Sequence, residues 1–85
     1  MTAAELWQRR RETGNTDISV RNRVKLARVE CGFTQQELAD RIGVTRQTIG
    51  LIESEQYNPT IILCLRLAQT LEKPLTDLFW AEEAL

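Results

Sequence analysis

The stretch from Thr34 to Glu53, TQQELADRIGVTRQTIGLIE, constrains the fold more than any other part of the 85-residue chain. Thr34 and Glu37 have the spacing of a capping box, in which each side chain accepts a hydrogen bond from the other residue's backbone N–H. Gly43 tolerates the left-handed backbone that often ends a helix, and Thr45 is placed to cap a second helix. Two short helices joined by a tight turn that contains glycine form a helix-turn-helix.

The first turn of the second helix carries polar side chains suited to DNA. Arginine and glutamine form paired hydrogen bonds with guanine and adenine edges, and a recognition helix presents its N-terminal residues to the major groove. We therefore expect Arg46 and Gln47 to contact bases, with Thr48 and Leu51 as lesser candidates, Leu51 through a thymine methyl group. The alternative is a helical hairpin with a solvated polar turn.

The start of the first helix suits a phosphate group. Free backbone N–H groups and the positive end of the helix dipole lie there, and Gln35 and Gln36 occupy this turn. The N-terminal part of the chain carries a basic run, Arg9–Arg11, which is either an arm that reaches DNA or a solvated tail. Trp7, close by, is a lone aromatic residue that packs either on the domain or on a second subunit.

The charge balance is unusual for a protein that binds DNA. The net charge is −1 and the sequence pI is about 5.4, whereas the footprint on DNA is generally basic. Residues 1–33 carry seven Lys/Arg against four Asp/Glu, and residues 34–85 carry four against eight. The acidic half should therefore point much of its charge away from DNA or toward a partner.

The sequence shows none of the motifs that indicate catalysis or metal binding. The chain has no histidine, no nucleophile with a base at motif spacing and no glycine-rich phosphate loop, so we expect neither an enzyme, nor a metal site, nor a cofactor. Cys31 and Cys64 lack metal-like spacing and fall at apolar helical positions, which favours buried reduced thiols over a redox switch. Without a long apolar run or a signal pattern, the expected location is cytoplasmic.

The chain divides into an N-terminal extension (residues 1–17), one domain (18–80) and a short tail (81–85). Residues 18–20 are either a short strand or the lead-in to a helix that ends near Cys31. Two further helices are expected, one over Ile61–Leu71 and one that starts at Pro74. The C-terminal part holds more apolar surface than five short helices can cover, which predicts a dimer through Leu75, Leu78, Phe79 and Trp80.

Three segments together resemble the Cro/C1-type helix-turn-helix family of bacterial and phage regulators, also called the XRE family. They are RVKLARVECGFTQQELADRIGVTRQTIGLIE, then YNPT, then LAQTLEKPLTDLF. This resemblance implies an all-α, five-helix lambda-repressor-like domain that binds a palindromic operator as a homodimer. It also implies phosphate contacts from Tyr57 and Asn58, for which the alternative is a polar turn in which Tyr57 partly packs, and an ion pair between Arg28 and Glu53. Thr45 is a further expected phosphate contact.

The function expected from the residues and the resemblance is sequence-specific DNA binding, most simply by a transcriptional repressor that blocks a promoter. The expected partners are double-stranded DNA and a second copy of the chain, with no membrane. The alternative is an antitoxin-like interaction module that neutralises a partner protein, for which the acidic half and residues 1–17 are available.

Overall fold

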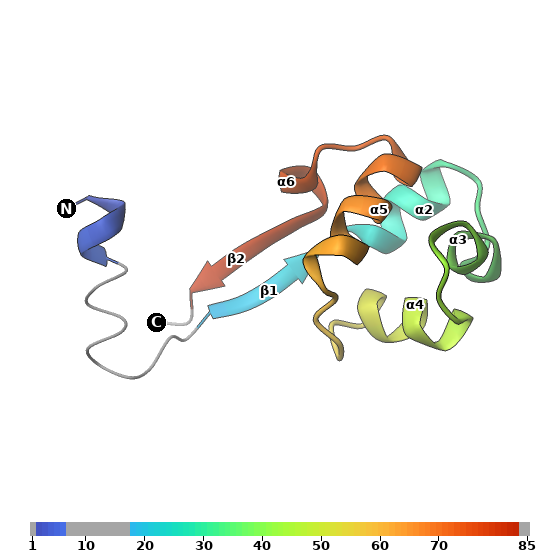
Figure 1. The fold of residues 1–85 in the computed structure, drawn as a ribbon, viewed down its shortest axis with the longest axis horizontal. Helices are drawn as coiled ribbons and strands as arrows, with labels where there is room; N and C mark the ends of the chain where they lie inside the picture. The colour runs from blue at the N-terminus through green and yellow to red at the C-terminus, as the bar shows by residue number, and fades with distance from the viewer. Residues whose placement is uncertain (1, 7–17, 84–85) are drawn as a thin grey trace.

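The computed structural model describes residues 2–6 and 18–83 of the chain. Residues 3–6 form one helical turn, followed by β1 (Ile18–Asn22), α2 (Val24–Glu30), α3 (Gln35–Ile42), α4 (Arg46–Glu53), α5 (Ile61–Leu71), α6 (Leu75–Leu78) and β2 (Phe79–Glu83). Figure 1 shows α2–α6 gathered in one cluster, from which β1 and β2 project as a ribbon. The proposed Arg9–Arg11 arm and the Trp7 contact lie outside the described residues.

The helix-turn-helix begins and ends where the sequence predicts. Thr34 Oγ1 accepts a hydrogen bond from Glu37 N (3.0 Å), and Glu37 Oε1 accepts one from Thr34 N (3.0 Å), which completes the capping box. Gly43 ends α3 with a φ of 78°, and Thr45 Oγ1 accepts from Thr48 N (3.2 Å) to start α4. The local signals of the sequence therefore account for both helices.

The capping box also affects the charge of Glu37. Hydrogen bonds from the backbone and then the side chain of Thr34 lower the pKa of this carboxyl group. Because the folded pKa lies below the unfolded one, the capping contribution is present above the unfolded pKa and is lost as pH falls through the folded pKa.

One hydrophobic core holds the helices together. Leu38 of α3 and Ile49 and Ile52 of α4 are completely buried, so the apolar stripes of the helix-turn-helix face inward. The other buried members are Val24, Ala27, Ala39, Ile42, Leu67, Leu71 and Leu78. Burial of these stripes leaves the opposite faces of α3 and α4 available to solvent.

A two-stranded antiparallel sheet accompanies the helices, which the all-α expectation did not include. Strand β1 pairs with β2 so that Asn22 lies opposite Phe79 and Arg21 opposite Trp80. The ribbon is fixed at its base, where Arg23 N donates to Leu78 O (2.9 Å). Of the two possibilities left open for residues 18–20, the strand is therefore the one adopted, and β2 carries the sheet past the expected domain end at residue 80.

The short α6 changes the set of residues that could meet a partner. It has only four residues, and it turns Leu78 into the core, where the side chain is 1% exposed. Phe79 packs against the same core, and Leu75 is partly buried. Leu78 is therefore taken up by the core of the monomer, whereas Leu75 and Phe79, which are partly buried, and the exposed Trp80 remain proposed residues of a dimer interface. Trp80 is 36% exposed, with the Arg23 guanidinium 4.7 Å from its ring centre.

The two cysteines differ in their surroundings. Cys64 is buried on α5, and this burial raises the pKa of its thiol. Cys31 directly follows α2 and is exposed, which corrects the expectation that both thiols are buried. Among residues 2–6 and 18–83, no helix is both long enough and apolar enough to span a membrane.

Candidate nucleic-acid interface

The predicted base-contacting residues lie on the outer face of α4. Burial of Ile49 and Ile52 fixes the rotation of this helix, so Arg46 and Gln47 in its first turn are exposed. Leu51, one turn further on, is 36% exposed. A short helix with its apolar side held in a core and long polar side chains at its N-terminus has the form of a recognition helix.

Residues from both helices of the helix-turn-helix meet at one shallow hollow. Gln35 from α3 lines it together with Arg46, Gln47, Gly50 and Leu51 from α4. Gly50 lies next to the Gln35 side chain, where a Cβ atom would make only an ordinary contact, 4.0 Å from the Gln35 amide nitrogen. The structure thus brings together one predicted phosphate contact and three of the predicted base contacts.

The glutamine side chains at the start of α3 are already oriented by neighbouring carboxylates. Gln35 Nε2 donates to Glu53 Oε1 (3.0 Å), and Gln36 Nε2 donates to Asp40 Oδ1 (2.8 Å). Each amide nitrogen carries a second N–H, so each remains able to donate to a phosphate oxygen. The backbone N–H groups of this first turn precede the ladder of helical hydrogen bonds, which gives a phosphate further donors.

Thr45 and Thr48 have a structural role that limits their freedom to contact DNA. Thr45 Oγ1 accepts from Thr48 N as the helix cap, and the two hydroxyl groups lie 3.0 Å apart. One of these hydroxyls donates to the other, and either can be the donor. The remaining hydroxyl proton is the group that could reach a phosphate or a base edge.

Arg28 of α2 and Glu53 at the end of α4 lie together. Arg28 Nε is 2.7 Å from Glu53 Oε2, and the two side chains are 11% and 5% exposed. Arg28 Nη1 also donates to Phe33 O (2.8 Å), in the segment that leads into α3. Since Gln35 binds the other carboxylate oxygen, Glu53 connects α2 and the start of α3 to the end of the recognition helix.

The loop after α4 contains the other predicted phosphate contacts. Tyr57 and Asn58 are both exposed there, with Tyr57 at 39%. The loop begins at a fixed position because Glu55 adopts a left-handed backbone (φ 63°) and its carboxylate lies 2.9 Å from Arg21 Nε of β1. The exposed Tyr57 and Asn58 therefore extend from an anchored loop.

Asn22 is a structural residue that the sequence analysis missed. Its Nδ2 donates to Ile52 O near the end of α4 (2.9 Å), and its Oδ1 accepts from Val24 N at the start of α2 (3.1 Å). One amide therefore joins the ribbon, the first helix of the cluster and the recognition helix. The signal in the sequence was an Asn two residues before Val24, since an Asn side chain often accepts a hydrogen bond from the backbone N–H two residues further on.

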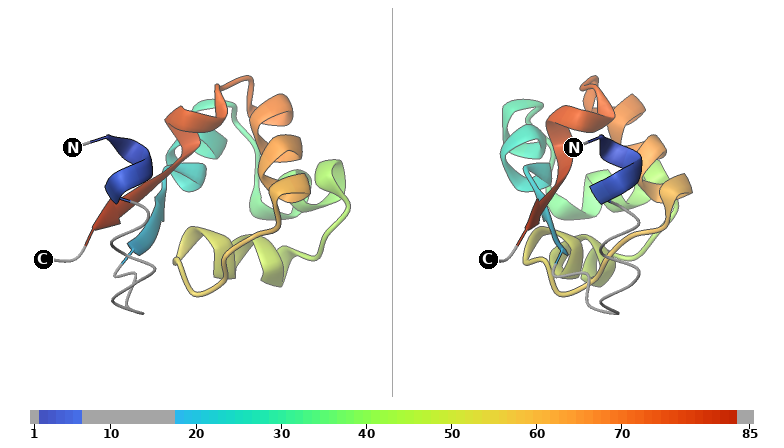
Figure 2. Two further views of the ribbon diagram at one scale, coloured as in Figure 1. Left: turned by 60° about the vertical axis from the view of Figure 1, so that its left-hand side comes forward. Right: turned by 90° about the vertical axis from the view of Figure 1, so that its left-hand side faces the viewer.

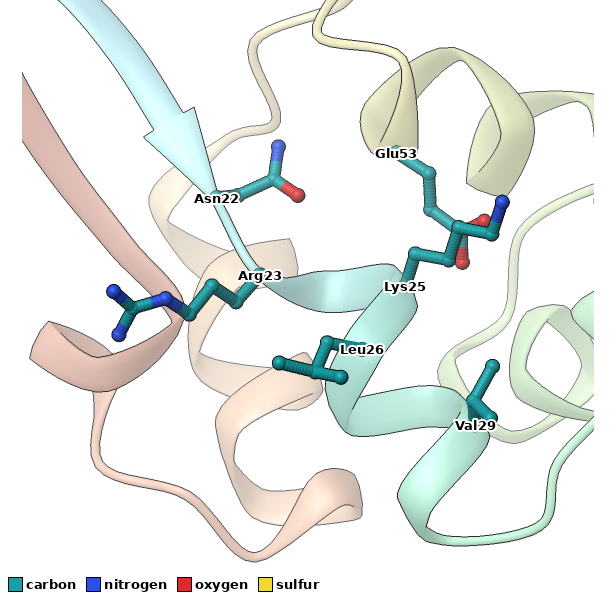
Figure 3. Close-up of a pocket in the computed structure, with 6 residues that line it drawn as sticks. All are labelled: Asn22, Arg23, Lys25, Leu26, Val29 and Glu53. Atoms are coloured by element: carbon teal, nitrogen blue, oxygen red, sulfur yellow. The ribbon is translucent and has the colours of Figure 1, made fainter.

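A second hollow lies on the outer face of α2 and is more apolar. Figure 3 shows Leu26 and Val29 pointing outward from α2, with Lys25 and Arg23 at its edges. Leu26 and Val29 are 57% and 58% exposed. This α2 groove contains none of the predicted base contacts, although Glu53 contributes to one side.

Comparison with known proteins agrees with this geometry. A family model described as "Helix-turn-helix" matches residues 24–78, which extend from the start of α2 to the end of α6. The chain belongs to this helix-turn-helix family. It is a DNA-binding transcriptional regulator of the Cro/C1 (XRE) type and not an enzyme.

Several regulators are similar to this helix-turn-helix protein over most of their length. The uncharacterised HTH-type transcriptional regulator YgzD of Bacillus subtilis is 38% identical over 64 residues, which cover 75% of this chain and 97% of YgzD. An HTH-type transcriptional regulator of Methanothermobacter thermautotrophicus is 43% identical over 65 residues, covering 75% and 94% of the two chains. Antitoxin HipB of Escherichia coli K12 is 38% identical over 55 residues, covering 65% and 62%.

Solved structures share the fold. The restriction-modification controller protein C.AhdI from Aeromonas hydrophila superposes with a TM-score of 0.60 at 28% identity, covering 64% of this chain and 78% of C.AhdI. The crystal structure of a protein from Bacteroides fragilis, described as a "putative DNA-binding protein", superposes with a TM-score of 0.67 at 24% identity, covering 72% of this chain and 98% of that protein. The helical cluster of this regulator is therefore the lambda-repressor-like domain that the sequence led us to expect.

Proposed function

We propose that this regulator binds a palindromic operator as a homodimer and represses transcription by occupying the promoter. The observation that carries the proposal is the exposed first turn of α4, where Arg46 and Gln47 extend from a helix whose opposite side is locked in the core. Two such helices, about 34 Å apart, would enter successive major grooves. Such a regulator would act in the cytoplasm, where its DNA is.

The base contacts and the phosphate contacts have separate roles in this proposal. Arg46 and Gln47 would bind guanine and adenine edges, with Thr48 beside them and Leu51 against a thymine methyl group. The phosphate contacts would come from the start of α3, the cap of α4 and the loop after it, namely Gln35, Gln36, Thr45, Tyr57 and Asn58. Base contacts carry sequence information, whereas phosphate contacts fix the register.

One experiment tests this division of roles. The preferred sequence is first selected from random DNA, and the Gln47→Ala and Gln35→Ala variants are then titrated with the selected and a scrambled duplex. Gln47→Ala should cost about 1–3 kcal/mol on the selected duplex and relax the preference at one base position in each half-site. Gln35→Ala should weaken both duplexes similarly and leave the preferred sequence unchanged.

Salt dependence provides an independent measurement on the same samples. The net charge of −1 suggests few phosphate–cation contacts, so the affinity should fall less steeply with salt than for a strongly basic protein. If Gln47→Ala weakens both duplexes equally while Gln35→Ala alters the base preference, the two helices have been given the wrong roles.

A second candidate function is neutralisation of a partner protein, and the likeness to antitoxin HipB favours it. The α2 groove, which is apolar and separate from the proposed DNA contacts, offers a surface for such a partner. Expression together with the products of neighbouring genes, followed by purification, would distinguish the candidates. A stoichiometric complex that survives salt and in which Leu26→Asp blocks assembly would support the second function.

A further inference from the structure

The turn that ends α4 has a glutamate at the position where glycine is the usual residue. Glu55 adopts a left-handed backbone (φ 63°), and its N–H donates to Ile52 O (3.0 Å). Gln56 N donates to Leu51 O (2.9 Å), and these two bonds together form a Schellman motif. The Cβ atom of a side chain disfavours this backbone conformation. A left-handed glutamate therefore persists only where its surroundings hold it in place.

Two neighbouring residues of β1 hold this turn. Arg21 Nε lies 2.9 Å from Glu55 Oε2. Asn22 Nδ2 donates to Ile52 O (2.9 Å), the same carbonyl that accepts from Glu55 N. Figure 2 shows β1 beside the yellow end of α4 and the loop that follows it. The turn is therefore held by a strand that lies outside the helix-turn-helix.

The residues proposed to bind phosphate on this loop follow the turn directly. Tyr57 and Asn58 are two and three residues beyond Glu55, and both are exposed. Rotation of the Glu55 backbone out of the left-handed region would redirect the segment after it, because φ and ψ are the only soft dihedrals of the chain. A hydrogen bond forms only at about 2.7–3.2 Å, so this rotation would remove the phosphate contacts of the loop.

We propose that Arg21 is a positioning residue for DNA binding, which acts through Glu55 and does not itself contact DNA. Its guanidinium group holds the left-handed turn, and the turn sets the direction of Tyr57 and Asn58. This proposal rests on the proposed function, which assigns phosphate contacts to those two residues. The ribbon then takes part in DNA binding without entering either groove of the duplex.

A direct contact between Arg21 and a phosphate group is the alternative, and the charges around the guanidinium oppose it. Arg21 Nη1 lies 3.4 Å from Glu82 Oε2 of β2, while Nε is bound to Glu55. These three side chains together carry a net negative charge, which repels a phosphate group. By charge alone, removal of the Glu55 carboxylate would therefore strengthen DNA binding. The positioning role predicts the opposite sign.

The size of the expected effect follows from the exposure of the pair. The side chains of Arg21 and Glu55 are 49% and 32% exposed. Exposed ion pairs change an equilibrium by about 1.5- to fivefold, which becomes about 2- to 25-fold on an operator that binds two chains. Loss of the pair should therefore weaken operator binding measurably without unfolding the protein.

The first test compares single variants on the operator selected from random DNA. Arg21→Ala and Glu55→Ala should each weaken binding within the range just given, with the base preference unchanged, while Arg21→Lys should retain most of the affinity. The matched control is Glu72→Ala, since Glu72 is also a left-handed glutamate (φ 55°) that ends a helix, in this case α5. This control should bind like the unchanged chain. Tighter binding by Glu55→Ala would overturn the proposal.

A glycine at position 55 separates positioning from direct contact. Glycine adopts the left-handed backbone without the Cβ penalty, so in Glu55→Gly the turn no longer needs the arginine. Arg21→Ala should therefore weaken binding in the Glu55 chain and have no further effect in Glu55→Gly. An equal loss in both chains would show that Arg21 contacts phosphate directly, and would overturn the proposal.

A measurement without DNA keeps this inference separate from the proposed function. Exchange of the Gln56 amide hydrogen should be faster in Arg21→Ala than in the unchanged chain, and slow again when Glu55→Gly is added. Unchanged exchange in Arg21→Ala would overturn the positioning role. If the unchanged chain prefers no DNA sequence, the proposed function fails, while the exchange rates still decide whether Arg21 holds the turn.

Discussion

The contact between Arg28 and Glu53 supports a quantitative prediction for stability. Both side chains are almost completely enclosed, at 11% and 5% exposure, and their charged atoms are 2.7 Å apart. Removal of one partner from such a pair leaves the other charge buried, at a cost of about 3–5 kcal/mol. Because Arg28 keeps its hydrogen bond to Phe33 O when Glu53 is removed, we expect Glu53→Ala to cost about 3 kcal/mol, at the lower end.

The reverse substitution should be more damaging. Arg28→Ala leaves the Glu53 carboxylate with only the amide of Gln35, and it also removes the donor to Phe33 O, so its cost should approach about 5 kcal/mol. A loss of 3 kcal/mol corresponds to a Tm lower by about 12–24 °C for a domain of this size. The double change Arg28→Met with Glu53→Leu should restore most of the stability, because it leaves no buried charge.

The assay is urea unfolding followed by circular dichroism, at one fixed protein concentration because dimerisation would contribute to stability. Glu30→Ala is the matched control, since Glu30 and Lys73 form a looser pair (3.5 Å) with side chains 52% and 41% exposed. This control should change the unfolding free energy by less than about 1 kcal/mol. The reasoning is refuted if Glu53→Ala is as mild as the control, or if the apolar double variant is less stable than either single variant.

Three further predictions concern backbone, cap and thiols. Gly50→Ala should leave the free energy of unfolding unchanged or raise it by up to about 1 kcal/mol, because the new Cβ atom makes only ordinary contacts. Gly43→Ala should lower the free energy of unfolding by about 1–2 kcal/mol, because Gly43 has a left-handed backbone with a φ of 78°. Thermal unfolding of the two variants checks both expectations. Thr45→Ala should cost about 0.5–2 kcal/mol in the same measurement, and no change would mean that its cap is dispensable. Titration with a disulfide reagent should modify Cys31 quickly and Cys64 only on unfolding, because burial raises the pKa of Cys64; equal rates would contradict this.

The parts of the fold set by near neighbours in the chain could be predicted from the sequence. The capping box of Thr34 and Glu37, the stop at Gly43 and the cap at Thr45 depend on residues at most four positions apart. The apolar stripes then determine which faces are buried, and therefore that Arg46 and Gln47 point outward. For the same reason, the candidate DNA-binding face could be located before the structure was known.

Features that depend on distant residues could not be predicted in this way. The ribbon pairs residues from opposite ends of the domain, such as Arg21 with Trp80, and neither five-residue strand has a distinctive pattern of its own. The pairing leads the chain into β2 directly after Leu78, so the last helix has only four residues and Leu78 faces the core. The interface residues expected at the C-terminus were chosen from the surplus of apolar residues there, and this count could not show that Leu78 belongs to the core.

The ribbon also has a consequence for the order in which the protein folds. The helices make contacts between neighbours in the chain, but β1 and β2 can pair only after a long loop has closed, which is slow and entropically costly. An isolated two-stranded ribbon is marginally stable in water, so it should open often from its tip. Amide hydrogen exchange should therefore be slowest near Asn22 and Phe79 at its base and faster toward Ser19 and Glu82.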